Sequence, residues 1–211
     1  MDTVDAHLGI AELRAVLEAV FLENTGVPPE EYSSGEHSVS GYVMARAIGT
    51  AVIHASGNCF IIADENAKVY ISGRARCSAY GEAYVQGIEN SKSVLNDECT
   101  GSVCQNAEMV CLGKSRVHVS GGGCASLSGN SHATVSGGYV TASEDATISL
   151  VAESTIRAIG RVVITQGPFV NSSDVRCGED AVLIGAWRPG DRKPNNGFGL
   201  PLLKKSPLQQ G

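Results

Sequence analysis

The most regular feature of this chain is an alternation of small or apolar residues with polar residues, repeated every eight residues from about Gly41 to Gly167. When octads are counted from Gly49, the third, fifth and seventh positions fall on one side of an extended strand, because strand side chains alternate between two faces. The 45 inward positions of fifteen octads contain no charged residue, although 18% of the chain is charged. The pattern therefore predicts short β-strands with one buried face.

The phase of this repeat shifts once. After Val135 a seven-residue unit restores the pattern, and the shift coincides with the pair Gly137 and Gly138. Eight of the fifteen octads begin with Gly, and Asn follows the first residue in five of them. Gly and Asn tolerate left-handed backbone conformations, so these positions are predicted to be corners between strands.

A fixed short period of this kind is typical of stacked repeats, in which each unit buries its apolar face only against its neighbours. We expect an all-β fold, a single parallel β-solenoid. The small inward residues favour two octads, or sixteen residues, per coil, whereas three octads per coil would enclose a wider interior that needs bulkier side chains. At about 4.8 Å per strand, some eight coils would form a rod on the order of 40 Å long.

The solenoid is predicted over residues 33–167, with an N-terminal helix and cap over residues 1–32. Between Ala6 and about Asn24 apolar residues recur at helical spacing, and Gly26 with the prolines after it ends the helix. Such a helix can cap an open end of the solenoid. The alternative is a dimerisation or partner-docking helix, for which the candidate residues are Leu13, Leu17 and Phe21.

Beyond the repeat, residues 168–187 are predicted to form a hairpin or a last irregular coil, and residues 188–211 a mobile basic tail. The tail contains an apolar island, and short partner-binding segments often have this form. The candidate partner-binding residues there are Phe198, Leu202 and Leu203.

Net charge and composition limit the classes of partner that are expected for this chain. The net charge of −6 divides into +4 from Arg188 onward and −10 before it, so the body is expected to repel nucleic acid phosphates. No signal-peptide pattern and no membrane-spanning apolar stretch is found, which predicts a cytoplasmic protein without a membrane partner, or a virion-associated one if it is phage-encoded. The seven cysteines lack zinc-site spacing and are interpreted as small reduced core residues, with metal binding or disulfides as the alternatives.

Two groups of polar residues are candidates for chemistry, and no cofactor is predicted. With sixteen residues per coil, Arg116 lies over His132 with His118 as a diagonal neighbour, which suggests an anion-binding cluster or an ordinary polar surface. Asp64, Glu65, Asp97 and Glu98 fall along one corner edge with further carboxylates. Paired carboxylates can bind calcium or act as the acid and base of a glycosidase. A solvated acidic edge that blocks sheet association is the alternative.

The pattern is clearest in the run GTAVIHASGNCFIIADENAKVYISGRARCSAYGEAYV, residues 49–85. It resembles the degenerate A-x-V-x-A-x-G-x repeats of bacterial and phage β-solenoid (β-helix) proteins, over about 125 residues. Such solenoids occur in phage tail spikes, surface adhesins, polymer-forming scaffolds and toxin modules. The resemblance implies a fold and carries over no catalytic residue.

Two functions are therefore expected from the sequence. The first is a non-enzymatic scaffold or binding module, a rigid rod that contacts protein partners or further copies of itself. The second is a carbohydrate-binding or carbohydrate-active β-helix of the tail-spike or adhesin type.

Overall fold

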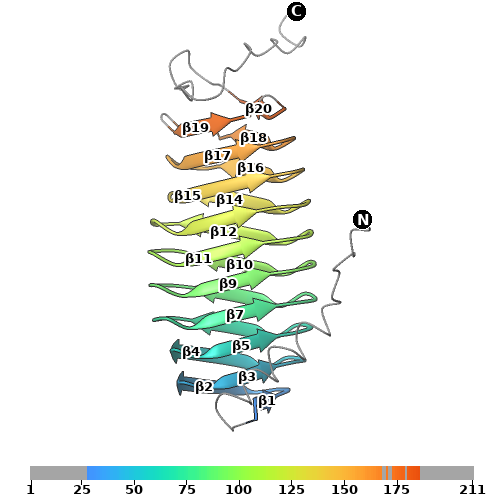
Figure 1. Ribbon diagram of the computed structural model, residues 1–211, viewed down its shortest axis with the longest axis vertical. Coiled ribbons are helices and arrows are strands. Elements are labelled where there is room, and N and C mark those ends of the chain that lie inside the picture. Colours follow the sequence, from blue (N-terminus) through green and yellow to red (C-terminus); the bar gives the residue numbers. More distant parts are fainter. Residues whose placement is uncertain (1–27, 168–169, 171–172, 179, 186–211) are drawn as a thin grey trace, which may run out of the picture.

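The computed structural model describes residues 28–167, 170, 173–178 and 180–185, and this part of the chain contains strands and no helix. The strands form two ten-stranded parallel sheets that face each other along the length of a solenoid (Figure 1). Odd-numbered strands make up one sheet, sheet A, and even-numbered strands the other, sheet B. Each coil therefore contributes one strand to each sheet, which confirms the predicted all-β parallel β-solenoid.

Most strands are four to six residues long. Sheet A consists of β1 (Glu30–Tyr32), β3 (Met44–Ala47), β5 (Phe60–Ala63), β7 (Arg76–Ala79), β9 (Lys92–Leu95), β11 (Glu108–Cys111), β13 (Cys124–Leu127), β15 (Tyr139–Ser143), β17 (Thr155–Ile159) and β19 (Asp174–Cys177). Sheet B consists of β2 (Glu36–Gly41), β4 (Val52–Gly57), β6 (Lys68–Ile71), β8 (Tyr84–Gly87), β10 (Thr100–Val103), β12 (Arg116–Ser120), β14 (His132–Ser136), β16 (Thr147–Leu150), β18 (Val163–Gln166) and β20 (Val182–Ile184).

The register between neighbouring strands is sixteen residues over most of the solenoid. In sheet A Ser78 pairs with Val94, and in sheet B Thr100 pairs with Arg116. This confirms two octads per coil. The predicted phase shift is also present, because Cys124 pairs with Tyr139, fifteen residues later.

The interior between the sheets is filled by the inward positions of the octads. They form one continuous cluster of buried side chains, in which small residues such as Ala51 and Ala67 alternate with larger ones such as Ile53 and Val69. Because alternate residues of each strand point inward, the cluster runs through successive coils. The outward positions therefore form columns of residues in register on the two outer faces.

The corners of the solenoid require left-handed backbone conformations. Most corner positions are Gly, but in the described part of the chain five other residues also have φ between 55° and 61°: Glu65, Glu89, Asp97, Gln105 and Glu144. Each of these five side chains accepts a hydrogen bond from a backbone N–H at the corresponding corner one coil earlier. Such a conformation costs roughly 1–2 kcal/mol in a residue with a side chain, and the hydrogen bond offsets part of that cost.

The two ends extend past the predicted limits of 33–167. At the first coil β1 pairs in parallel with β3, and at the last coil β19 and β20 pair with β17 and β18 at a spacing of nineteen residues. Because β19 and β20 lie in different sheets, they form a last coil rather than a hairpin. The predicted helix over residues 6–24 and the tail over residues 188–211 lie outside the described residues.

All seven cysteines lie in the described part of the chain, and none of them forms a disulfide. Cys59, Cys77, Cys99 and Cys111 are buried, as expected for small core residues, and the other three are partly exposed. Burial raises the pKa of Cys99 to about 11 and that of Cys111 to about 12. These buried thiols are therefore protonated at neutral pH.

Candidate binding groove on sheet B

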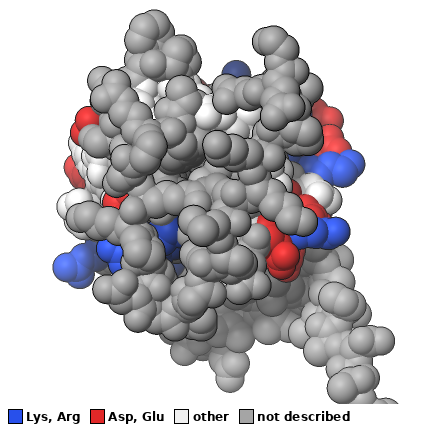
Figure 2. All heavy atoms as spheres, turned by 90° about the horizontal axis from the view of Figure 1, so that it is seen from above, with Lys and Arg blue, Asp and Glu red and all other residues white. Residues whose placement is uncertain are grey.

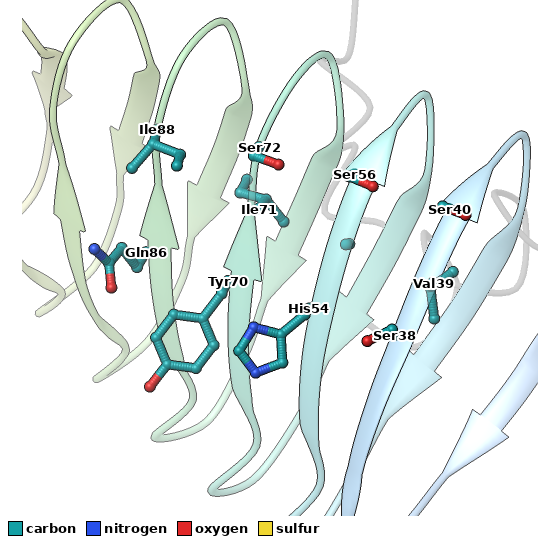
Figure 3. A pocket seen from close by; sticks show the side chains of 11 residues that line it. Ser38, Val39, Ser40, His54, Ser56, Tyr70, Ile71, Ser72, Gln86 and Ile88 are labelled. Atoms are coloured by element: carbon teal, nitrogen blue, oxygen red, sulfur yellow. The ribbon is translucent and has the colours of Figure 1, made fainter.

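A groove of about 340 Å³ opens on sheet B at the N-terminal end of the solenoid (Figure 3). It crosses four neighbouring strands, β2, β4, β6 and β8. The lining combines four kinds of group, which are hydroxyls, two rings, one amide and aliphatic side chains: Ser38, Val39, Ser40, His54, Ala55, Ser56, Tyr70, Ile71, Ser72, Gln86 and Ile88. Val39, Ala55 and Ile71 are buried in the core and form the floor, so the groove offers chiefly the two rings and hydrogen-bonding groups to a ligand.

The rings of His54 and Tyr70 stack on one another in this groove. These residues pair in register on β4 and β6, so their side chains project side by side from the outer face (Figure 3). Their ring centroids are 4.9 Å apart with an interplanar angle of 9°. Tyr84 extends the array beyond the groove, because its ring meets the Tyr70 ring edge-on at 6.1 Å. Three rings from three successive coils thus form an aromatic ladder.

Polar contacts fix both ends of this ladder. His54 Nε2 lies 2.9 Å from Glu36 Oε1, and the Tyr84 hydroxyl lies 3.2 Å from Ser102 Oγ. These contacts restrict the rotation of the two outer rings. A ligand therefore meets an array that is already ordered, which lowers the entropy lost on binding.

Hydroxyl groups lie on the corner side of the rings. Ser40 and Ser56 are partners in register on β2 and β4, and Ser72 follows on the next coil. Gln86 lies in the column of His54 and Tyr70, one coil beyond Tyr70. Serine hydroxyls and the glutamine amide both donate and accept hydrogen bonds. The arrangement can bind an elongated polar molecule that also has a flat apolar face.

The predicted cluster of Arg116, His118 and His132 lies farther along the outer face of sheet B. Arg116 and His132 pair in register, and His118 Nε2 lies 3.2 Å from Ser136 Oγ. Burial, and secondarily the Arg116 guanidinium, lowers the pKa of His132. His132 is therefore mostly neutral at pH 7, and the permanent positive charge of the cluster comes from Arg116.

The four carboxylates proposed for a metal or catalytic site do lie along one corner, but they make contacts within the solenoid. Glu65 Oε2 accepts a hydrogen bond from the Gly49 N–H at 3.0 Å, and Asp97 Oδ2 accepts one from Gly81 N–H at 3.3 Å. The other two form ion pairs, Asp64 with Arg46 at 3.5 Å and Glu98 with Lys114 at 3.2 Å.

Because Glu65 and Asp97 are two coils apart, at about 4.8 Å per coil, these side chains are spread along the edge. Seen along the solenoid axis, acidic and basic side chains lie next to one another around the periphery (Figure 2). Among the described residues no group of three or more His, Cys, Asp or Glu side chains is placed to hold a metal ion.

The six apolar residues proposed for partner binding, Leu13, Leu17, Phe21, Phe198, Leu202 and Leu203, lie outside the described residues. Within the part of the chain that the structure describes, no helix has the length and hydropathy to cross a membrane.

Sequence reasoning placed Arg116 over His132 but missed the aromatic ladder. The same rule would have found it, because His54, Tyr70 and Gln86 are outward residues spaced by sixteen. Tyr84 belongs to a neighbouring column, so its contact with Tyr70 depends on side-chain conformation. No pattern in the sequence predicts the groove itself.

Comparison with known proteins gives no relative for this chain: no family model, no curated protein and no solved structure matches it.

Proposed function

We propose that this protein is a non-enzymatic scaffold or binding module, a rigid rod that binds protein partners or further copies of itself through its outer faces. The observation that carries the proposal is an apolar patch on the outer face of sheet A, formed by Val94, Val110 and Leu112. Val94 and Val110 pair in register, and Val110 and Leu112 are 37% and 36% exposed.

Ion pairs flank this patch. Lys92 Nζ lies 2.7 Å from Glu108 Oε2 in the neighbouring column, and Lys114 at the adjacent corner pairs with Glu98. An apolar centre with a charged rim is the usual composition of a protein interface. The sheet beneath it is hydrogen-bonded and packed on the core, so the patch is presented on a rigid support.

Sedimentation of the full chain over roughly a hundredfold range of concentration tests self-association. The proposal predicts concentration-dependent assemblies that Val110→Asp weakens at least about tenfold, since a charge buried in an interface is unfavourable. Thr100→Asp is the matched control, because Thr100 points outward on sheet B, the face opposite the patch. The proposal also includes binding to a different protein. Cross-links to such a partner that disappear in Val110→Asp would support this form of it.

A second candidate is a carbohydrate-binding module, and the aromatic ladder beside the groove favours it. Sugar rings have apolar C–H faces that pack on aromatic rings, while their hydroxyls need donors and acceptors such as Ser56, Ser72 and Gln86. Binding sites for small molecules commonly combine apolar walls with a few such polar groups.

A glycan array followed by thermal shift with the best glycan tests this candidate. Carbohydrate binding predicts that the glycan raises the melting temperature of the protein, and that Tyr70→Ala abolishes this rise. Tyr139 lies on the outer face of sheet A, so Tyr139→Ala is the control and should keep the rise. A monodisperse monomer that a glycan stabilises would replace the scaffold proposal with this one. A monomer that binds neither a protein partner nor any glycan would contradict both.

A further inference from the structure

The outer face of sheet B carries basic residues and no carboxylate over most of its length. From β4 to β16, strands whose residues the structure describes in full, no outward position is Asp or Glu. The same positions include Lys, Arg and His side chains: His54, Lys68, Arg116, His118 and His132. On a chain with a net charge of −6, this face is suited to an anionic ligand.

The carboxylates nearest to this face lie on β2 or at the corners, and several make contacts within the solenoid. Some accept hydrogen bonds from backbone N–H groups one coil earlier: Glu65, Asp97 and Glu144. Others pair with basic or imidazole groups: Glu36 with His54, Glu98 with Lys114 and Asp145 with Arg161. In contrast, neither Lys68 nor Arg116 forms an ion pair with another described residue, and both are exposed. These two cations are therefore available to a ligand.

The aromatic ladder and the Arg116 cluster occupy the same two columns of this face. In the first column each residue pairs in register with the next, in the order His54, Tyr70, Gln86, Ser102, His118 and Thr134. The second column runs in the same way through Lys68, Tyr84, Thr100, Arg116 and His132. Tyr84 connects the two columns, because its hydroxyl lies 3.2 Å from Ser102 Oγ. The ladder therefore leads to the cluster with no acidic residue between them.

The two ends of this tract offer different groups to a ligand. From His54 on β4 to His132 on β14 there are five strand spacings, or roughly 24 Å at about 4.8 Å each. A ligand that reaches both ends must be elongated. It meets the faces of rings at β4 and β6 and the Arg116 guanidinium at β12. A guanidinium binds carboxylates and tetrahedral oxyanions through paired, charge-assisted hydrogen bonds.

We infer that the outer face of sheet B binds an acidic oligosaccharide, whose sugar rings pack on His54 and Tyr70 and whose carboxylate or sulfate group binds Arg116. The inference rests on the carbohydrate-binding candidate above and names the class of its ligand. A nucleic acid strand matches the tract less well, because it carries a phosphate at every nucleotide. The cations Lys68 and Arg116 are three strand spacings, or roughly 14 Å, apart.

Isothermal titration calorimetry of the full chain with matched pairs of oligosaccharides tests this inference. One pair is hexagalacturonate and its methyl ester, and the other is a sulfated dextran oligosaccharide and its unsulfated parent. Each pair keeps the sugar backbone and changes only the charge. In at least one pair the acidic member is expected to bind at least about tenfold more tightly than the neutral one, because hydrogen bonds to charged groups are the stronger ones.

Two variants separate the contributions of the two ends. Arg116→Gln should weaken binding of the acidic member about tenfold and leave binding of the neutral member unchanged. Tyr70→Ala should weaken both members alike, because it removes a ring on which the sugars pack. Arg76→Gln is the matched control and should change neither, since Arg76 is exposed at the corresponding position on the outer face of sheet A. Melting temperatures without ligand check that each variant is folded.

The outcomes that overturn the inference bear differently on the carbohydrate candidate. Equal binding of the acidic and neutral members would contradict an acidic ligand and leave carbohydrate binding in place, whereas no binding of any oligosaccharide would contradict both. Binding of the acidic member that Arg116→Gln or Tyr70→Ala leaves intact would show that the two ends do not share one ligand. Tighter binding of a single-stranded oligonucleotide than of either acidic oligosaccharide would make nucleic acid the ligand instead.

Discussion

Glu89 lies one coil after Gly73, and its Oε2 atom accepts a hydrogen bond from the Gly73 backbone N–H at 2.7 Å. The next coil repeats the relationship, because Gln105 Oε1 accepts a hydrogen bond from the Glu89 N–H at 3.0 Å. Polar side chains at these corners thus link successive coils at positions where other coils have Gly. This contact gives a structural reason for several carboxylates that the sequence alone left open to catalysis or metal binding.

The corner contact at Glu89 predicts different losses of stability for two substitutions. Glu89→Ala removes the hydrogen bond and keeps a side chain at φ 60°, so it should destabilise the protein by about 1–2 kcal/mol. Glu89→Gly also removes the bond but relieves the backbone strain, so its effect should be close to zero. Urea denaturation midpoints of the two variants measure the difference. Equal losses would show that the strain at this corner is negligible.

Gly101 predicts a limit on side-chain size inside the solenoid. It occupies an inward position, and a Cβ atom there would lie 2.8 Å from the Val85 carbonyl oxygen and 2.9 Å from Met109 Sδ. Because the backbone oxygen belongs to the sheet, Gly101→Val should lower stability by roughly 1–3 kcal/mol or more.

The neighbouring position supplies the control for Gly101. Thr100 points outward, so Thr100→Val should change stability by less than about 0.5 kcal/mol. Thermal unfolding of the two variants measures both effects. A Gly101→Val variant as stable as the parent would mean that this interior is less tightly packed than the structure shows.

Much of the fold was predictable because the physical constraint is local and repeated. A strand that buries one face needs uncharged residues at every second position. This requirement predicts the phase of the octad repeat and its shift at Gly137 and Gly138. Together with two octads per coil, it also predicts that Arg116 and His132 lie in one column. The last coil was harder, because the spacing between β17 and β19 is nineteen residues and the octad pattern stops at Pro168. The strands beyond that point have no repeat to identify them.

The sites were less predictable, because they depend on contacts between columns. Met44 and Ile62 point outward on sheet A and are nevertheless buried, at 2% and 1% exposed. Periodicity could not predict this, since outward apolar residues such as Val110 and Leu112 look the same in the sequence. Only the exposed fractions of the side chains in the structure distinguish the first two residues from the last two. The hydrogen bond of Glu65 to Gly49 likewise depends on side-chain placement.

The buried thiols predict a loss of stability at high pH. The pKa of Cys99 is raised to about 11 and that of Cys111 to about 12, chiefly by burial, from an ordinary value near 9. Between these values the unfolded chain releases protons that the folded chain retains. The contribution of these thiols to the free energy of unfolding is fully present below about pH 9. It falls as the pH rises to 11 or 12, by at most about 1.4 kcal/mol per pH unit for each thiol.

Denaturation midpoints at pH 8, 10 and 11 measure this effect, because they run from below the ordinary pKa of about 9 up to the raised pKa of Cys99, about 11. Cys111→Ala should be less stable than the parent at pH 8, because it leaves a small cavity, but it should lose less stability between pH 8 and 11. An equal loss in both proteins would mean that other groups cause the alkaline decline.

The groove, the corner contacts and the outer-face columns all depend on the sixteen-residue register, so this register is the central claim. It can be tested by disulfide trapping in a variant whose partly exposed Cys104, Cys124 and Cys177 are replaced by Ser. Ser78 and Val94 pair in adjacent strands of sheet A, at a spacing of about 4.8 Å that suits a disulfide. Ser102 lies in sheet B, and a coil of three octads would instead place it beside Ser78.

Mass spectrometry under mild oxidation then gives the most direct answer. Two octads per coil predict a disulfide in the Ser78→Cys, Val94→Cys variant and none in the Ser78→Cys, Ser102→Cys variant. A disulfide in the second variant and not in the first would contradict the register and every site built on it.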